Sequence, residues 1–288
     1  MPAEGQDSLP RVTITTEPAT LQEGSVGWLR VGARDGIVVS GGEVAGEPLH
    51  FEASRDSAFR GLIAAPVEVP DSLLVSLFLD QAGRSDTLRI FVPVRRAGYP
   101  SEMLSVPPAY ARPDSAATVR IQSEIERSRQ VSRTSQGTPR IWRGPFRLPR
   151  RSHITSRFGT ARVYNGEVQS RHLGTDFAGA IGAPVRAAGR GVVALVANFY
   201  LAGRAVYIDH GAGLVTGYVH LSRTDVREGD TVVAGQPIGA VGQSGRVTGP
   251  HLHWVARYGA ISVDPMGLLQ LERMSSGHGT SKESRKRP

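Results

Sequence analysis

The 288-residue sequence contains no cysteine. This absence excludes disulfide bonds, a thiol nucleophile and any thiolate metal site, so metal chemistry would have to use His, Asp or Glu. The longest mainly apolar stretch, residues 73–79, is far shorter than the roughly 18 residues that a membrane helix needs. The first residues show neither a basic segment nor an apolar one. We therefore expect no transmembrane segment, and no signal peptide is visible.

Negative charge is scarce in the later part of the chain. Residues 1–100 carry a net charge of −4, whereas residues 101–288 carry +12. A basic region favours an anionic partner such as nucleic acid, a membrane surface or a cell-wall polymer. Aromatic residues make up only 6% of the chain and are not interleaved with the basic ones. The sequence therefore does not predict nucleic-acid binding.

Short runs of β-forming residues, separated by glycine-containing turns, fill most of the chain. About seven such runs within residues 1–97, at intervals of roughly 8–12 residues, predict a β-sandwich. Residues 142–270 show the same character with almost no helical periodicity, and predict a second all-β domain. Within it, residues 226–242 resemble a tight hairpin pair.

The segment between the two predicted domains, residues 98–141, is interpreted as a connector. Its prolines exclude long regular structure at its start, but no helix breaker occurs between Thr118 and Val131. A helix near 114–133, capped by Asp114 or Ser115, is therefore expected. Its thin apolar stripe predicts a helix on a domain surface; the stripe comprises Val119, Ile121, Ile125 and Val131. Residues 271–288 are polar and basic and predict a disordered tail.

Histidines are concentrated where the chemistry is expected. Six of the eight lie between positions 153 and 253. His251 and His253 would share one face of a strand, His172 and Asp176 are separated by three residues, and His220 ends an apolar strand. This clustering suggests one divalent metal held by two imidazoles and one carboxylate, which leaves a fourth position for water. Further histidines nearby would carry protons or stabilise an oxyanion.

The residues around these histidines resemble the lysostaphin-type (LytM-type) zinc metallopeptidases that cut peptidoglycan peptides. The resemblance covers positions 156–265, a little over a third of the chain, and its motifs occur in the family's order. They are Ser156-Arg157-Phe158-Gly159, His172-Leu173-Gly174-Thr175-Asp176, Tyr218-Val219-His220-Leu221-Ser222, Gly229-Asp230 to Ile238-Gly239, and Gly249-Pro250-His251-Leu252-His253-Trp254. The preceding β-rich segment is similar to the immunoglobulin-like module of some exported members.

The resemblance implies a role for each matching residue. His172, Asp176 and His253 match the zinc ligands, so one Zn²⁺ per chain is expected. His220 and His251 match the two catalytic histidines that do not bind the metal. Tyr164, in a variable loop, is similar to a tyrosine that helps to stabilise the oxyanion in some members.

The resemblance also implies the reaction and its place. We expect a zinc endopeptidase that hydrolyses peptidoglycan stem peptides or cross-links outside the cytoplasm, in the periplasm or the extracellular cell wall. The basic part of the chain would face anionic cell-wall or envelope polymers. The bond that is cut, and which of His220 and His251 is the general base, stay open.

Two other functions would also be compatible with parts of the sequence. Degenerate relatives without ligands bind the cell wall and activate amidases, but every expected ligand is present here. The Gly229–Gly239 segment also resembles half of a biotinyl or lipoyl carrier domain. Such carriers need a lysine at the hairpin tip, and both lysines, Lys282 and Lys286, lie in the tail.

Overall fold

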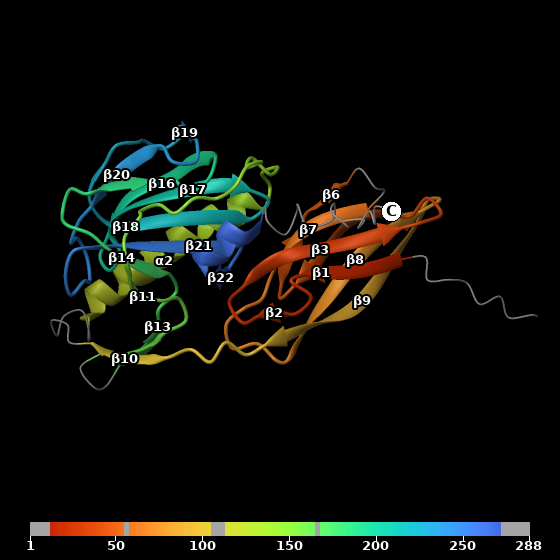
Figure 1. Cartoon of the computed structure of the whole chain (residues 1–288), viewed down its shortest axis with the longest axis horizontal. Helices are drawn as coiled ribbons and strands as arrows, with labels where there is room; N and C mark the ends of the chain where they lie inside the picture. The colour runs from red at the N-terminus through yellow and green to blue at the C-terminus, as the bar shows by residue number, and fades with distance from the viewer. Residues whose placement is uncertain (1–11, 55–57, 105–112, 165–167, 272–288) are drawn as a thin grey trace, which may run out of the picture.

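The computed structural model describes residues 12–54, 58–104, 113–164 and 168–271. The fold is almost entirely β, as expected, and has two lobes along its long axis (Figure 1). Strands β1 to β9 form the sandwich, red to orange in the figure, and the C-terminal lobe contains all later elements. Among the described residues, no helix is long and apolar enough to cross a membrane.

The sandwich has two sheets. The first, in the order β1-β3-β7-β6, consists of β1 (Val12–Glu17), β3 (Val26–Ala33), β7 (Ala58–Ala64) and β6 (Phe51–Ala53). The second, in the order β2-β9-β8-β4-β5, consists of β2 (Leu21–Gln22), β9 (Arg84–Arg95), β8 (Ser72–Gln81), β4 (Val38–Val44) and β5 (Glu47–Leu49). With the short strands β2 and β5 left aside, β1, β3, β7 and β6 correspond to strands A, B, E and D of an immunoglobulin fold, whose first sheet has the order ABED.

The local sequence accounts for the long β8–β9 hairpin. Ala82 and Gly83 both adopt positive φ angles, of 48° and 79°, as the two central residues of a type I′ turn must. Along β8, Leu73, Val75 and Leu77 are buried while Leu74 is half exposed. This alternation places one face of the sheet on the core and the other in solvent.

The C-terminal lobe is built on a ten-stranded sheet. Seven strands run in the order β11-β14-β21-β18-β17-β16-β19, and β15, β20 and β22 pair at its sides. Their bounds are β11 (Ile154–Ser156), β14 (Thr175–Ala178), β15 (Pro184–Arg186), β16 (Gly191–Phe199), β17 (Gly203–Gly211), β18 (Leu214–Thr224), β19 (Thr231–Val232), β20 (Pro237–Val241), β21 (His251–Tyr258) and β22 (Ile261–Val263).

The prediction of a hairpin over residues 226–242 is wrong. β19 pairs with β16, whereas β20 pairs with β15 and β18. The reason is that the segment between them bonds elsewhere: Gly235 N donates to Ala187 O, and Ala187 N donates to Gln236 O, both at 2.8 Å. The two short strands therefore join different parts of the sheet.

The connector contributes a strand that the sequence analysis missed. β10 (Ser101–Leu104) pairs in parallel with β12 (Ala161–Tyr164), which pairs with β13 (Val168–Arg171). In Figure 1, the chain after β9 runs across from the sandwich to β10, which lies at the C-terminal lobe near β13. A segment outside residues 142–270 is therefore part of that lobe.

Helix α2 (Ser115–Ser135) begins after Asp114, whose side chain accepts a hydrogen bond from Ala117 N at 2.7 Å. It packs against β16, β17 and β18. The expected apolar stripe is wrong at Val119, which is 71% exposed. Besides Ile121, the buried residues of the helix are serines, because small side chains allow the helix to lie close to the sheet: Ser128, Ser132 and Ser135.

The two lobes are packed against each other. Trp28 of β3 donates from Nε1 to Leu271 O at 2.9 Å, just after the 3₁₀ helix η1 (Pro265–Gln270), and its ring lies 5.7 Å from that of Trp142. His50 Nε2 donates to Gln136 Oε1 at 2.6 Å, which is a structural role. One hydrophobic core extends through both lobes. The division into independent domains at 1–97 and 142–270 therefore stays a prediction.

Candidate metal centre and active site

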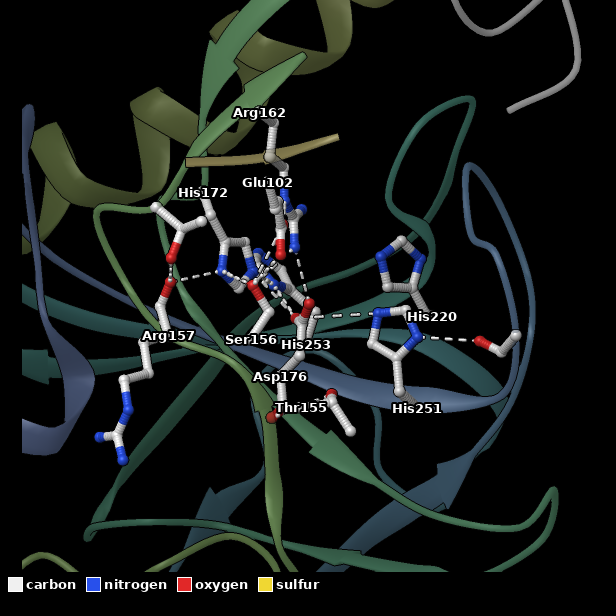
Figure 2. A network of polar contacts seen from close by, with 12 residues as sticks. Glu102, Thr155, Ser156, Arg157, Arg162, His172, Asp176, His220, His251 and His253 are labelled. Atoms are coloured by element: carbon white, nitrogen blue, oxygen red, sulfur yellow. Dashed lines mark hydrogen bonds and ion pairs between the residues drawn. The ribbon is translucent and has the colours of Figure 1, made fainter. Parts of the chain in front are cut away.

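Two neighbouring strands bring three donor atoms together. Asp176 on β14 stands directly opposite His253 on β21, and His172 precedes β14. The distances are 2.6 Å from His253 Nδ1 to Asp176 Oδ1, 2.9 Å from His172 Nε2 to the same oxygen, and 2.9 Å between the two ring nitrogens. Figure 2 shows the three side chains converging on one point. The structure thus places His172, Asp176 and His253 in a single cluster that could hold a metal.

The tautomer of His172 makes this cluster suited to a cation. His172 Nδ1 lies 2.8 Å from Arg157 O, and because a carbonyl only accepts, Nδ1 carries the proton. In the neutral ring Nε2 is then an acceptor, and it faces another acceptor, Asp176 Oδ1. A cation between them satisfies both atoms. Two imidazole nitrogens and one carboxylate oxygen match the donor set of a catalytic zinc site, and a backbone-held Nδ1–H is typical of a zinc-bound histidine.

Burial and the neighbouring side chains together determine the protonation states in the cluster. Asp176 is 5% exposed, and burial alone would raise its pKa, but His253 and His172 beside it bring the pKa below its usual value. Its carboxylate is therefore charged at neutral pH. Burial lowers the pKa of His253 to about 4, so this ring is neutral and can bind a metal.

Gly174 is required by the close approach of His253. A Cβ atom at this position would lie 2.5 Å from His253 Cε1 and 2.7 Å from the backbone oxygen of Trp254. Any side chain would therefore push the ring of a ligand away from its present place. The glycine between His172 and Asp176 belongs to the site through its lack of a side chain.

His220 and His251 lie beside the cluster. Their rings are 4.9 Å apart, and the ring of His220 is 5.9 Å from that of His253. His251 shares a strand face with His253 because the two alternate along β21. His220 sits at a β-bulge, where the β17–β18 register shifts, with a φ of 62° that a non-glycine residue rarely adopts.

Both of these histidines are held in one tautomer by the backbone. His220 Nδ1 donates to Ser244 O and His251 Nδ1 donates to Gly249 O, each at 2.8 Å. Nε2 is therefore the proton-accepting nitrogen of each neutral ring. Burial, with His253 and His251 close by, lowers the pKa of His220 to about 3. The ring of His220 is thus neutral and able to accept a proton.

Tyr164 is the last residue of β12, but its side chain lies outside the described part of the structure. Its proposed contribution to an oxyanion site stays a prediction.

Two residues without an expected role in the site, Arg162 and Ser156, contact the ligands, and a third, Glu102, contacts both of them. Arg162 donates from Nη2 to Asp176 Oδ2 at 2.9 Å and from Nε to Glu102 Oε1 at 2.6 Å. Ser156 Oγ lies 3.2 Å from Glu102 Oε1 and 3.1 Å from His172 Nδ1. Ser156 belongs to a motif that the sequence analysis quoted, but Glu102 lies in the connector. No spacing rule points to Glu102, because only the pairing of β10 brings it there.

Comparison with known proteins agrees with this geometry. The description "Peptidase family M23" matches residues 170–265. The peptidoglycan DD-endopeptidase ShyC of Vibrio cholerae is 38% identical over 133 residues, which cover 46% of this chain and 30% of that protein. ShyA of the same organism, also a peptidoglycan DD-endopeptidase by name, is 52% identical over 104 residues, 35% of this chain and 24% of ShyA. The chain thus spans less than a third of the length of these relatives.

A solved structure extends the likeness in fold to both lobes. A crystal structure from Pseudomonas aeruginosa, described as an M23 peptidase, aligns with a TM-score of 0.64 at 22% identity. The alignment covers 86% of this chain and 94% of the other. At this identity the likeness concerns the fold alone. The family match, the relatives and the donor cluster agree: residues 170–265 match peptidase family M23, and a β-rich module with an immunoglobulin-like strand order precedes them.

Proposed function

We propose that the protein is a zinc-dependent endopeptidase that hydrolyses peptide bonds of peptidoglycan. The observation that carries the proposal is the convergence of His172 Nε2, Asp176 Oδ1 and His253 Nδ1 beside two further histidines whose protons are fixed on Nδ1. Three protein ligands with an open position are typical of catalytic rather than structural zinc. The M23 match and the names of the relatives support peptidoglycan as the substrate.

The residues of the chain divide the work of hydrolysis. Zinc, when bound, supplies Lewis-acid chemistry that acidifies a water molecule and polarises a peptide carbonyl. His172, Asp176 and His253 hold the ion. Nε2 of His220 or of His251 accepts the proton that the attacking water loses, and the same ring then donates this proton to the leaving amine. The backbone bonds at Nδ1 keep both rings oriented for this transfer.

The names of the relatives also favour one bond. ShyA and ShyC are both called DD-endopeptidases, which favours the D,D cross-link between stem peptides over a glycine bridge. Such a substrate lies outside the cytoplasm, so the proposed place of action is the periplasm or the cell wall. The net positive charge of residues 101–288 would assist contact with anionic envelope polymers.

Digestion of purified sacculi of known chemistry tests the proposal. Soluble products are identified by mass spectrometry for the zinc-loaded protein and for the His253→Ala variant. We expect cross-linked dimers to be converted to monomers by the wild type, and no conversion by the variant. If the zinc-loaded wild-type protein leaves the sacculi uncut, the proposed peptidase activity is rejected. If that protein then stimulates a purified amidase, the result favours a non-catalytic regulator that binds the cell wall and activates amidases.

A further inference from the structure

The metal centre has a neighbour from outside the C-terminal sheet. β10 of the connector pairs in parallel with β12, and this register sets Glu102 directly opposite Arg162. Figure 2 shows Arg162 reaching between Glu102 and Asp176. The side chains are largely shielded from water, with exposed fractions of 27% for Glu102, 17% for Arg162 and 7% for Asp176.

Arg162 binds Asp176 through the carboxylate oxygen that faces away from the two histidine ligands. Asp176 Oδ1 lies among the ring nitrogens, whereas Oδ2 accepts from Arg162 Nη2 at 2.9 Å. A guanidinium presents its donors in a rigid plane, so fixing one edge fixes the other. Glu102 binds the Nε edge at 2.6 Å and thereby sets the direction of the Nη2 donor.

Glu102 also reaches the first histidine ligand. Ser156 Oγ donates to Glu102 Oε1 at 3.2 Å and lies 3.1 Å from His172 Nδ1. One carboxylate thus contacts the partners of two ligands, Asp176 through Arg162 and His172 through Ser156.

We propose that Glu102 is a positioning residue of the metal centre, supplied by the connector, which orients Asp176 through Arg162 and His172 through Ser156. The inference rests on the proposed metal site and deepens it. Groups that orient metal ligands change metal affinity by roughly 10–100-fold when they are replaced. The connector then completes a site whose ligands all lie in the M23 domain.

Zinc affinity of the full-length protein tests this role. Affinity is measured by competition with a chromophoric chelator for the wild type, Glu102→Gln and Arg162→Gln. Gln keeps the size of Glu102 but loses its charge, and we expect zinc to bind about 10-fold more weakly. Arg162→Gln should weaken binding by about 10–100-fold. The double variant should lose less than the product of the two effects, because Glu102 acts mainly through Arg162.

A spectroscopic signature and a matched control separate positioning from general stability. The d–d absorption of bound Co²⁺ should shift in Glu102→Gln, since the ligand geometry changes. Glu68→Gln is the control: Glu68 pairs with Arg171 between the two lobes, at 2.7 Å from Arg171 Nε, without touching a ligand. It should leave both zinc affinity and the Co²⁺ spectrum unchanged.

The outcomes are distinguishable. Wild-type zinc affinity and an unchanged Co²⁺ spectrum in Glu102→Gln would overturn the positioning role while leaving the metal centre intact. Equal losses in Glu102→Gln and Glu68→Gln would assign the effect to lobe packing and would also overturn it. Zinc retained at full affinity by His253→Ala would reject the metal centre itself. Should Glu102→Ala fail to fold, the isosteric Gln variant still decides the question.

Discussion

Strand β8 of the sandwich and strand β18 of the C-terminal sheet differ in how they are buried. Along β8 buried and exposed residues alternate, whereas β18 is buried without interruption from Leu214 to Leu221. The cause is coverage: the sheet containing β8 has one face in solvent, but β18 has a core on one face and α2 on the other. A sheet covered on both faces can enclose polar groups away from water.

The C-terminal sheet contains buried polar side chains of this kind. Several of its buried polar side chains have hydrogen-bond partners or lie in the donor cluster: His172, Asp176, His210, Thr216 and His220. The low dielectric strengthens the interactions of such groups and shifts their pKa values. Among the described residues of the sandwich, the buried side chains are apolar. Substitutions in the sandwich should therefore change stability, whereas substitutions in the C-terminal sheet should also change metal binding and catalysis.

The largest loss of zinc binding and activity should come from substitution of a metal ligand. Replacing His253 or Asp176 by Ala removes one of three donors, and zinc should be lost on gel filtration. Activity on sacculi should fall by more than about 10⁴-fold, because Lewis-acid chemistry disappears with the metal. Metal content by elemental analysis, measured beside product formation, checks this. Stoichiometric zinc in either variant would show that the cluster is not the metal site.

A smaller effect is expected at His220. His220→Ala leaves all three donors in place, so zinc should be retained at one ion per chain. Turnover should fall by about 10²–10⁴-fold, the usual contribution of a positioned acid–base group. His251→Ala, measured in parallel, shows which ring carries the larger share. Loss of zinc from His220→Ala would mean that this ring binds the metal.

Two buried leucines test the contrast between the sheets directly. Leu77 on β8 and Leu252 on β21 are both 0% exposed, and each Leu→Ala change should lower the free energy of unfolding by about 2–5 kcal/mol. Only Leu252 lies between His251 and His253. Leu252→Ala should therefore also weaken zinc binding, whereas Leu77→Ala should not. Urea unfolding measures the change in stability, and chelator competition measures the change in zinc affinity. Equal zinc affinities in the two variants would show that the ligands keep their positions when the packing of β21 is weakened.

The sequence predicted the features that depend on short-range patterns. The all-β class followed from the alternation of β-forming runs and turn glycines, and the resemblance from motifs that are contiguous in the chain. The spacing of His251 and His253 fixes their common face on a strand, whatever the rest of the fold does. The roles of these residues stay predictions that the experiments above address.

Features that depend on long-range pairing were beyond the sequence. Glu102 reaches the site only because β10 pairs with β12, a parallel pairing between segments about 60 residues apart. The serines of α2 gave no apolar stripe, yet their small size lets the helix pack against the sheet. The hairpin expected over residues 226–242 failed for the same reason, since each half pairs with a different distant strand.

The smallest expected effect concerns acid stability, and it comes from His210 in the C-terminal sheet. His210 is 0% exposed; its Nδ1 donates to Arg190 O at 2.8 Å and its Nε2 lies 2.8 Å from Thr216 Oγ1. Burial lowers its pKa to about 4, against an ordinary value of 6.5. Between these pH values the unfolded chain binds the proton and the folded chain does not, so stability falls as the pH drops from about 6.5 to 4.

The loss from this one group should reach about 2–3 kcal/mol at pH 4.5. His210→Asn keeps a donor for Arg190 O but cannot titrate, so its stability should depend less on pH by that amount. Urea unfolding of both proteins at pH 7 and pH 4.5 measures the difference. The other histidines, and any acid release of metal, are common to both proteins and cancel in it. Identical pH dependence in the two proteins would mean that the protonated His210 ring is tolerated inside the sheet, so that coverage on both faces does not exclude charge at this position.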